Sequence, residues 1–129
     1  MVAKKKREEN TSPDFKRGFV ALIFIFEVIL VFTFFDYIIH AISPDYTVPS
    51  YYFTNKIIYG TLIGFVTYLL VRKKPLVQKS AILAATVSVL LQIRYLLVGY
   101  PLSFVLLFLV IHFVILFIVT YIGCKIAKM

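Results

Sequence analysis

Ionisable side chains inside long apolar runs are the residues of this sequence that could do chemistry. Glu27, Asp36 and His40 lie in one run from Gly18 to Ile42, which is long enough to cross a bilayer. A charged group at membrane depth costs about 3 kcal/mol or more, so such groups need partners or a purpose. Buried carboxylates and imidazoles also suit proton binding and release. The polar candidates of all the apolar runs are Glu27, Asp36, His40, Asn55, Lys56, Arg94 and His112.

Counting residues from the expected helix ends, at about 1.5 Å of rise each, assigns these candidates to two depths. The shallower layer lies near the extracytoplasmic surface, and its only acid and only guanidinium are Asp36 and Arg94. We therefore expect an ion pair between these two residues. The members of this layer are Asp36, His40, Asn55, Lys56, Arg94 and Tyr95.

The deeper layer contains Glu27 and His112, each about ten residues from the nearer end of its run. A hydrogen bond between them would relieve both groups, and together they could form a proton relay. Glu27 precedes Asp36 by nine residues, which places the two about 180° apart around one helix. The first helix is then expected to make polar contacts on two opposite faces, which favours an oligomer or a partner membrane subunit. The alternative is that Glu27 faces lipid in its neutral form.

A metal centre is the most specific enzyme interpretation of these residues. Asp36 and His40 share one helical face, and His112 could supply a third ligand. The residue count, however, places His112 about 10 Å or more deeper than His40. There is no HExxH motif, the same mismatch argues against bis-histidine haem, and no motif supports catalysis by Ser103. The sequence therefore predicts no metal and no cofactor, and it gives no positive sign of an enzyme.

The elements that must position these groups follow from composition. Of 129 residues, 61% are hydrophobic, and the mean hydropathy is +0.93. The apolar residues form long blocks separated by proline and glycine signals, which predicts one all-α integral membrane domain, an antiparallel four-helix bundle. Residues 1–11 are expected to be a flexible basic segment. The helices are expected at about 13–42, 54–71, 76–98 and 102–124.

Small residues at helical spacing mark the surfaces on which these helices would pack. Gly60 and Gly64 form a GxxxG pattern that permits close approach of two backbones. On the third helix Ser80, Ala84 and Ser88 form a similar stripe. These positions are interpreted as helix-packing residues.

The net charge of +8 is distributed in a way that predicts orientation. Twelve of the 14 Lys and Arg lie in the N-terminal segment, the second connection (72–79) and the C-terminal tail, whereas the first and third connections have none. In a four-span protein these basic segments share one side, so both termini are expected in the cytoplasm and the protein in the cell membrane. The same distribution points to anionic lipid as the partner of the charges and away from nucleic acid.

The run from Ala21 to Val28, ALIFIFEV, places a glutamate in mid-membrane in the first of four short helices. In this plan the chain resembles the small multidrug resistance transporters. The remaining sequence differs from that family, since it has no tryptophan and carries large aliphatic residues where the family is rich in glycine. The resemblance is limited to the number of helices and the position of the glutamate in the first of them.

Together these patterns predict a transport or permeation component of an oligomer that uses the layers Glu27/His112 and Asp36/His40/Arg94. The alternative is a non-catalytic structural or accessory subunit of a membrane complex, in which the same groups only specify helix packing. A third interpretation is an intramembrane metal-dependent enzyme.

Overall fold

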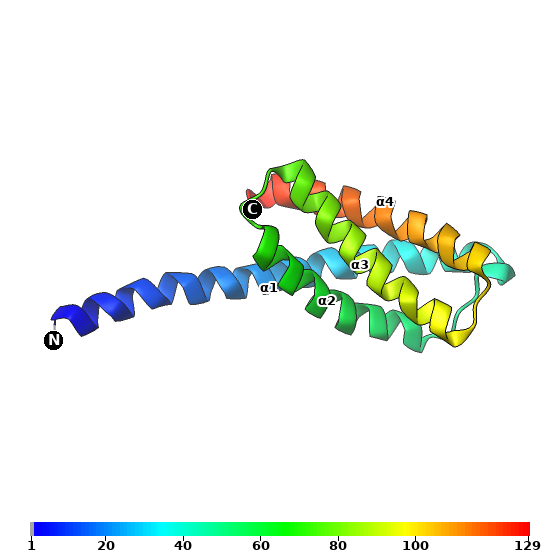
Figure 1. Cartoon of the computed structure of the whole chain (residues 1–129), viewed down its shortest axis with the longest axis horizontal. Coiled ribbons are helices and arrows are strands. Elements are labelled where there is room, and N and C mark those ends of the chain that lie inside the picture. Colours follow the sequence, from blue (N-terminus) through cyan, green and yellow to red (C-terminus); the bar gives the residue numbers. More distant parts are fainter. Residues whose placement is uncertain (1) are drawn as a thin grey trace.

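The computed structural model describes the backbone of residues 2–129 and the side chains of residues 14–129. Within these residues the chain is all-helical and has no strand, which confirms the predicted class and the predicted number of long helices. Figure 1 shows the four helices side by side, with the first part of α1 extending beyond the other three. The elements are α1 (Val2–Ile42), the 3₁₀ turn η1 (Pro44–Tyr46), α2 (Tyr51–Val71), α3 (Leu76–Val98) and α4 (Leu102–Ala127).

Three helix ends differ from the prediction. Helix α1 begins at Val2, well before the proline signal at Pro13, because the intervening Lys, Arg and Glu residues are strong helix formers. Helix α2 begins three residues early, since the amides of Tyr52 and Phe53 already bond back to the carbonyls of residues 49 and 50. Helix α4 continues to Ala127, three residues further than expected.

Helix α3 has the predicted limits, and its end shows why. Gly99 adopts a left-handed conformation with φ of 101°, which glycine reaches without steric cost. The amide of Tyr100 then bonds to the carbonyl of Tyr95 at 3.2 Å, which closes the last turn. Pro101 immediately precedes α4, so the chain passes from one helix to the next in very few residues.

The helices form a closed ring in which α1 packs on α2, α2 on α3, α3 on α4 and α4 on α1. Large aliphatic and aromatic side chains fill its centre. Gly60 and Gly64 lie on α2 where it meets α1, and a Cβ atom added at Gly64 would be 3.0 Å from Cγ2 of Ile25. On α3 the side chains of Ser80, Ala84 and Ser88 are fully buried. The larger fully buried apolar residues at the centre are Ile25, Ile29, Phe32, Leu83, Val87 and Leu116.

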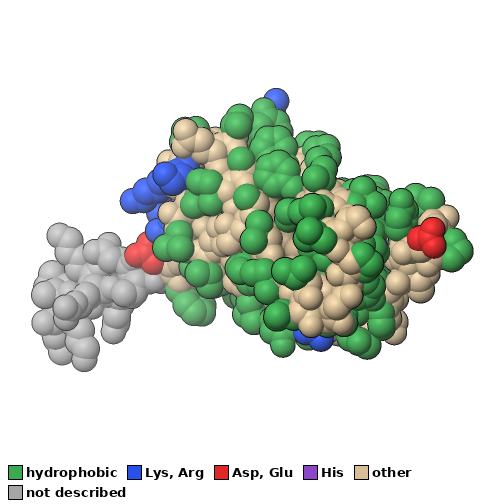
Figure 2. All heavy atoms as spheres, turned by 45° about the vertical axis from the view of Figure 1, so that its right-hand side comes forward, with side chains coloured by type: hydrophobic (Ala, Val, Ile, Leu, Met, Phe, Trp, Pro, Cys, Tyr) green, Lys and Arg blue, Asp and Glu red, His purple; other side chains and the backbone are tan. Residues whose placement is uncertain are grey.

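All four helices are long and apolar enough to cross a membrane: 14–42, 51–71, 76–98 and 102–127. The shortest has 21 residues, which corresponds to about 30 Å of rise and matches the hydrocarbon core of a bilayer. Large apolar side chains are exposed on every helix, and Figure 2 shows them spread over the visible face. Lipid is the solvent that such a surface requires.

Candidate functional site

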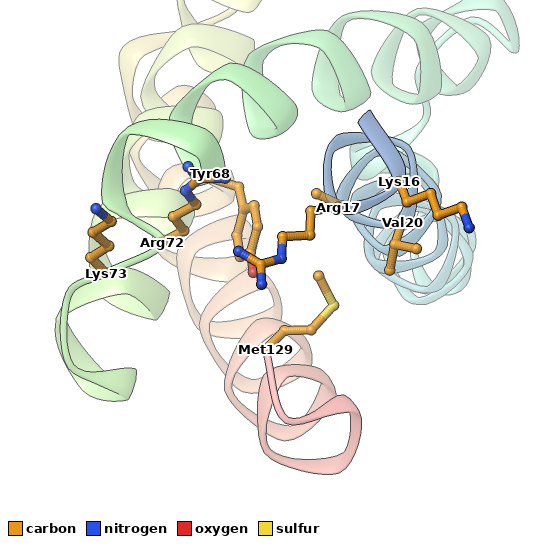
Figure 3. Close-up of a pocket in the computed structure, with 8 residues that line it drawn as sticks. Lys16, Arg17, Val20, Tyr68, Arg72, Lys73 and Met129 are labelled. Atoms are coloured by element: carbon orange, nitrogen blue, oxygen red, sulfur yellow. The ribbon is translucent and has the colours of Figure 1, made fainter. Parts of the chain in front are cut away.

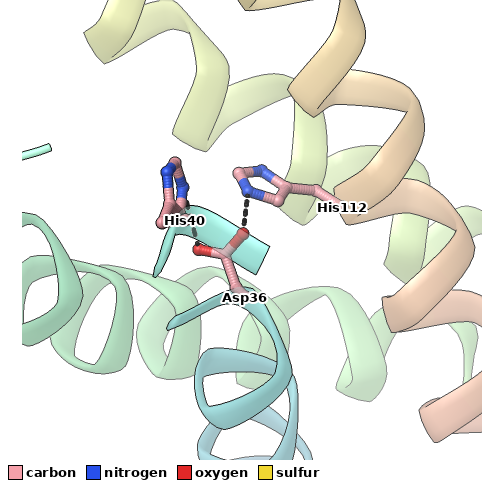
Figure 4. Close-up of side chains that lie close together, drawn as sticks. All are labelled: Asp36, His40 and His112. Atoms are coloured by element: carbon pink, nitrogen blue, oxygen red, sulfur yellow. Dashed lines mark hydrogen bonds and ion pairs between the residues drawn. The ribbon is translucent and has the colours of Figure 1, made fainter. Parts of the chain in front are cut away.

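A buried carboxylate, Asp36, joins three helices. Its side chain is fully buried on α1. Oδ2 accepts a hydrogen bond from Nζ of Lys56 on α2, and Oδ1 accepts one from Nε2 of His112 on α4 at 2.8 Å. Figure 4 shows the carboxylate of Asp36 between two imidazole rings. One acid therefore connects α1, α2 and α4 inside the ring of helices.

The second imidazole belongs to His40, one helical turn after Asp36. Its Nδ1 atom donates to the carbonyl oxygen of Tyr46 at 2.5 Å, and its ring stacks on Phe108 with a centroid distance of 4.2 Å. In the neutral ring with its proton on Nδ1, the Nε2 lone pair faces the cluster as an acceptor. Nε2 lies 3.5 Å from both Oδ2 of Asp36 and Nζ of Lys56. The turn after α1 thus holds the ring of His40 in place.

Gln92 on α3 extends the cluster to the fourth helix. Its amide nitrogen lies 2.8 Å from Nδ1 of His112 and donates to it, so the proton of His112 is on Nε2, which donates to Asp36. The other amide atom of Gln92, Oε1, is buried and has no hydrogen-bond partner among the described residues. A hydrogen-bonded chain therefore runs from Gln92 through His112 and Asp36 to Lys56.

Aromatic rings enclose the Lys56 end of this chain. Nζ of Lys56 lies 5.2 Å from the ring centroid of Phe53 and 5.3 Å from that of Tyr95, at cation–π distance. Lys56 itself is only 3% exposed, so its ammonium group has protein contacts in place of water. A buried ion pair of this kind is strongly coupled, because removing either partner leaves an uncompensated charge. We call Asp36, His40, Lys56, Gln92 and His112 the Asp36 cluster.

The predicted pair between Asp36 and Arg94 is wrong, because Lys56 takes the expected place. Arg94 is exposed, and its guanidinium lies 5.6 Å from the ring centroid of Tyr52. The buried face of α3 at this level presents Gln92 and Tyr95. Arg94 is two residues from Gln92, so it points about 200° away from that position.

The predicted pair between Glu27 and His112 is also wrong. Glu27 is exposed and borders a hollow of about 240 Å³ between α1 and α4, next to Val119 and Gly123. The angular separation of Glu27 and Asp36 was predicted correctly, since one is exposed and the other buried. His112 lies on the buried face of α4 and therefore contacts Asp36.

The separation of His40 and His112 by depth fails for a geometric reason. The ligand atoms of Asp36, His40 and His112 all lie within 4.8 Å of one another. The residue count assumed that helix ends lie level, but His40, at the end of α1, stacks on Phe108, already six residues into α4. Helix α4 thus continues past the end of α1, and the two predicted layers merge into one cluster.

Asn55 and Gln92 are the remaining polar residues close to the Asp36 cluster. Asn55 is half-buried beside Lys56, at the start of α2. Gln92 was not among the predicted site residues, although it continues the spacing of Ser80, Ala84 and Ser88 on α3. A buried amide four residues after Ser88 on that stripe was the signal that could have identified it.

A second polar feature lies at the other end of the bundle, where α1, the turn after α2 and the end of the chain meet. It is a cavity of about 500 Å³ with an apolar floor and a basic rim. In Figure 3 Arg17 points toward Tyr68, whereas the amine groups of Lys16 and Lys73 point outward. The lining residues are Lys16, Arg17, Val20, Ala21, Tyr68, Arg72, Lys73 and Met129.

Comparison with protein-family models, with curated proteins and with solved structures finds no match to this chain.

Proposed function

We propose that the chain is a four-span integral membrane protein that acts as a proton or cation transport or permeation component of an oligomer or larger membrane complex. The Asp36–Lys56 pair, buried with two histidines between helices that can cross a membrane, carries this proposal. Ionisable groups at membrane depth are expensive, and by default they mark an ion or proton pathway.

The Asp36 cluster offers the chemistry that such a role needs. Asp36 supplies a fixed negative charge, and Lys56 neutralises it without water. His112 and Gln92 form a hydrogen-bonded chain that leads away from the carboxylate toward α3. A proton or cation that reaches Asp36 can therefore take the place of the Lys56 ammonium at the carboxylate. Access requires the surrounding aromatic rings, Phe53, Tyr95 and Phe108, to move.

We further propose that the bundle is antiparallel and lies in the cell membrane, with both termini on the cytoplasmic side. The basic cavity supports this orientation. It brings Lys16 and Arg17 of α1 beside Arg72 and Lys73 of the α2–α3 connection, so two basic segments share one end of the bundle. Positive segments remain on the cytoplasmic side of a membrane, where anionic lipid attracts them.

The position of Glu27 supports assembly with further copies or with a partner membrane subunit. Its carboxyl group lies outside the Asp36 cluster, on a surface that otherwise faces lipid. A polar group in that environment gains from a hydrogen-bonding partner on another helix. The hollow beside Gly123 provides room for the approach of such a helix.

The test is ion flux across liposomes that contain the purified chain. Liposomes with a trapped pH-sensitive dye would be given a membrane potential, and the experiment would be repeated with a cation-sensitive dye. Wild type should exceed empty liposomes, and the charge-neutral double variant Asp36→Asn/Lys56→Met should return to the empty rate. The proposal fails if wild type equals empty liposomes or if the double variant conducts as well as wild type.

A structural or accessory subunit is the second candidate, and one observation favours it. Both oxygens of Asp36 and both ring nitrogens of His112 are hydrogen-bonded within the chain. A buried carboxylate and imidazole that are satisfied within the chain can have the sole role of fixing helix packing. In that case the flux experiment would show no transport, while the double variant would still alter assembly with the partner subunit.

A further inference from the structure

Three side chains of the Asp36 cluster present metal-ligand atoms at nearly the spacing of a metal centre. One oxygen of Asp36 and one ring nitrogen each of His40 and His112 all lie within 4.8 Å of one another. Two ligands of a tetrahedral zinc ion are separated by about 3.4 Å, because each is about 2.1 Å from the metal. Binding one ion therefore requires these atoms to approach one another by about 1.4 Å at most, through rotation of their side chains.

His40 is already oriented as a metal ligand. Its Nδ1–H group donates to the carbonyl of Tyr46, and its Nε2 lone pair faces Asp36. Histidines that bind metal in proteins almost always have this arrangement, in which a backbone carbonyl or a carboxylate fixes the ring through the other nitrogen. The stacking of His40 on Phe108 fixes the plane of the ring as well.

His112 needs one change, and Gln92 can provide it. Nε2 of His112 carries a proton that it donates to Asp36, so this nitrogen has no free lone pair. Rotation of the Gln92 amide would present Oε1, which is now buried without a partner, to Nδ1 of His112. The ring proton would then move from Nε2 to Nδ1, the Nδ1–H group would donate to Oε1, and the Nε2 lone pair would be free to bind metal. In the metal-bound state, Oε1 of Gln92 would thus gain a hydrogen-bond partner.

Lys56 competes with a metal for the same position. Its ammonium group bonds to Oδ2 of Asp36 and lies 3.5 Å from Nε2 of His40. A divalent cation must displace this ammonium from the carboxylate. Lys56 therefore lowers metal affinity while it keeps the buried charge of Asp36 neutralised when no metal is bound.

We infer that Asp36, His40 and His112 form a binding site for a divalent transition-metal cation of the zinc class, at which the metal and the Lys56 ammonium compete for Asp36. One carboxylate oxygen with two imidazole nitrogens favours zinc, cobalt or nickel over magnesium or calcium, which prefer oxygen ligands. This inference names a cation class for the site in the proposed function and so rests on that proposal.

The experiment titrates the purified full-length chain, in detergent and freed of any affinity tag, with zinc chloride, and with magnesium chloride as the control. The chain has two histidines and one cysteine, so few other zinc sites can form. Wild type should bind one zinc per chain and no magnesium. Lys56→Gln should bind zinc about tenfold or more tightly than wild type, since it removes the competitor and keeps a polar side chain.

Two variants test the ligands themselves. His40→Phe keeps the stacking on Phe108 but removes both ring nitrogens, and it should weaken zinc binding by about 100-fold in the Lys56→Gln background. Gln92→Leu should weaken it by about 10-fold, as expected for a group that orients a ligand. The inference is overturned if Lys56→Gln binds zinc no more tightly than wild type, or if His40→Phe binds it equally well.

Binding and transport can fail separately. Zinc binding with the expected variant pattern but without ion flux in liposomes would remove the transport role and leave the metal site. Ion flux without zinc binding would overturn the metal site and leave the transport role. Circular dichroism and size-exclusion chromatography of each variant show whether it has folded.

Discussion

Nζ of Lys56 on α2 donates a hydrogen bond to Oδ2 of Asp36 on α1, and both side chains are almost completely buried. The pair neutralises two charges in a region that has apolar side chains both on its exposed surface and in its interior. With His112 it also connects three of the four helices. The relative positions of these helices are therefore fixed by polar contacts in addition to apolar packing, and each of those contacts can be removed by a single substitution.

Gln92→Leu is expected to destabilise the folded chain. The substitution removes the donor to Nδ1 of His112, which leaves that buried nitrogen without a partner, at a cost of about 1–3 kcal/mol. Gln78→Leu on the same helix is the control, because Gln78 is exposed and its replacement should change the free energy of unfolding by less than about 0.5 kcal/mol. Denaturant titration in detergent measures both. Equal stability of the two variants would show that Gln92 does not support His112.

Gly64→Leu is expected to separate α1 from α2. Even a Cβ atom at this position would lie 3.0 Å from Ile25, so the larger side chain should destabilise the bundle by about 1–3 kcal/mol. Gly18→Leu is the matched control, since a Cβ atom there meets nothing within 4 Å. Thermal unfolding of both variants in detergent gives the comparison. A Gly64→Leu chain as stable as the control would contradict the close packing of these helices.

The proposed orientation predicts which residues a membrane-impermeant thiol reagent reaches from outside the cell. In a Cys124→Ala background, Asp45→Cys lies in the first connection and Lys73→Cys in the second, and both side chains are exposed. The reagent should label Asp45→Cys in intact cells and Lys73→Cys only after permeabilisation. The reverse pattern would place both termini outside.

Glu27→Trp is expected to disrupt assembly without unfolding the chain. The indole ring, which is larger than the carboxyl group, would occupy the hollow between α1 and α4 that we assign to another helix. Leu70→Trp is the control, because Leu70 is 80% exposed on α2, away from that hollow. Analytical ultracentrifugation in detergent should show a smaller particle for Glu27→Trp only. If neither variant changes particle size, Glu27 does not lie at an interface.

The fold could be predicted in its main features because each decisive signal is local. Apolar runs of the length of a membrane identify the four helices, and Pro75, Gly99 and Pro101 fix the short connections between α2, α3 and α4. The helix starts were less reliable. Pro13 does not mark the start of α1, because the Lys, Arg and Glu residues before it favour a helix, and α2 begins at Tyr51, two residues after Pro49.

The partners within the site could not be predicted by the same means. The sequence identifies Asp36, His40, Lys56 and His112 as polar residues in apolar runs, and all four are buried together. Their pairing depends on how far one helix is displaced along its axis relative to the next. That displacement depends on the packing of bulky side chains, such as the ring of His40 on Phe108, and it cannot be obtained by counting residues along the chain. Angular position around a helix was more informative, since it separated Glu27 from Asp36 correctly.

A double-mutant cycle tests most directly whether Asp36 and Lys56 form one charge-neutral pair inside the bundle. Asp36→Asn alone should cost about 3–5 kcal/mol of unfolding free energy, because it leaves the Lys56 ammonium buried and uncompensated. Adding Lys56→Met should recover about 2–3 kcal/mol relative to the sum of the single effects. The control cycle of Asp36→Asn with Arg94→Met should be additive within about 0.5 kcal/mol, since Arg94 is exposed and points elsewhere. Additivity for Asp36 and Lys56, or coupling to Arg94 in its place, would contradict the pair.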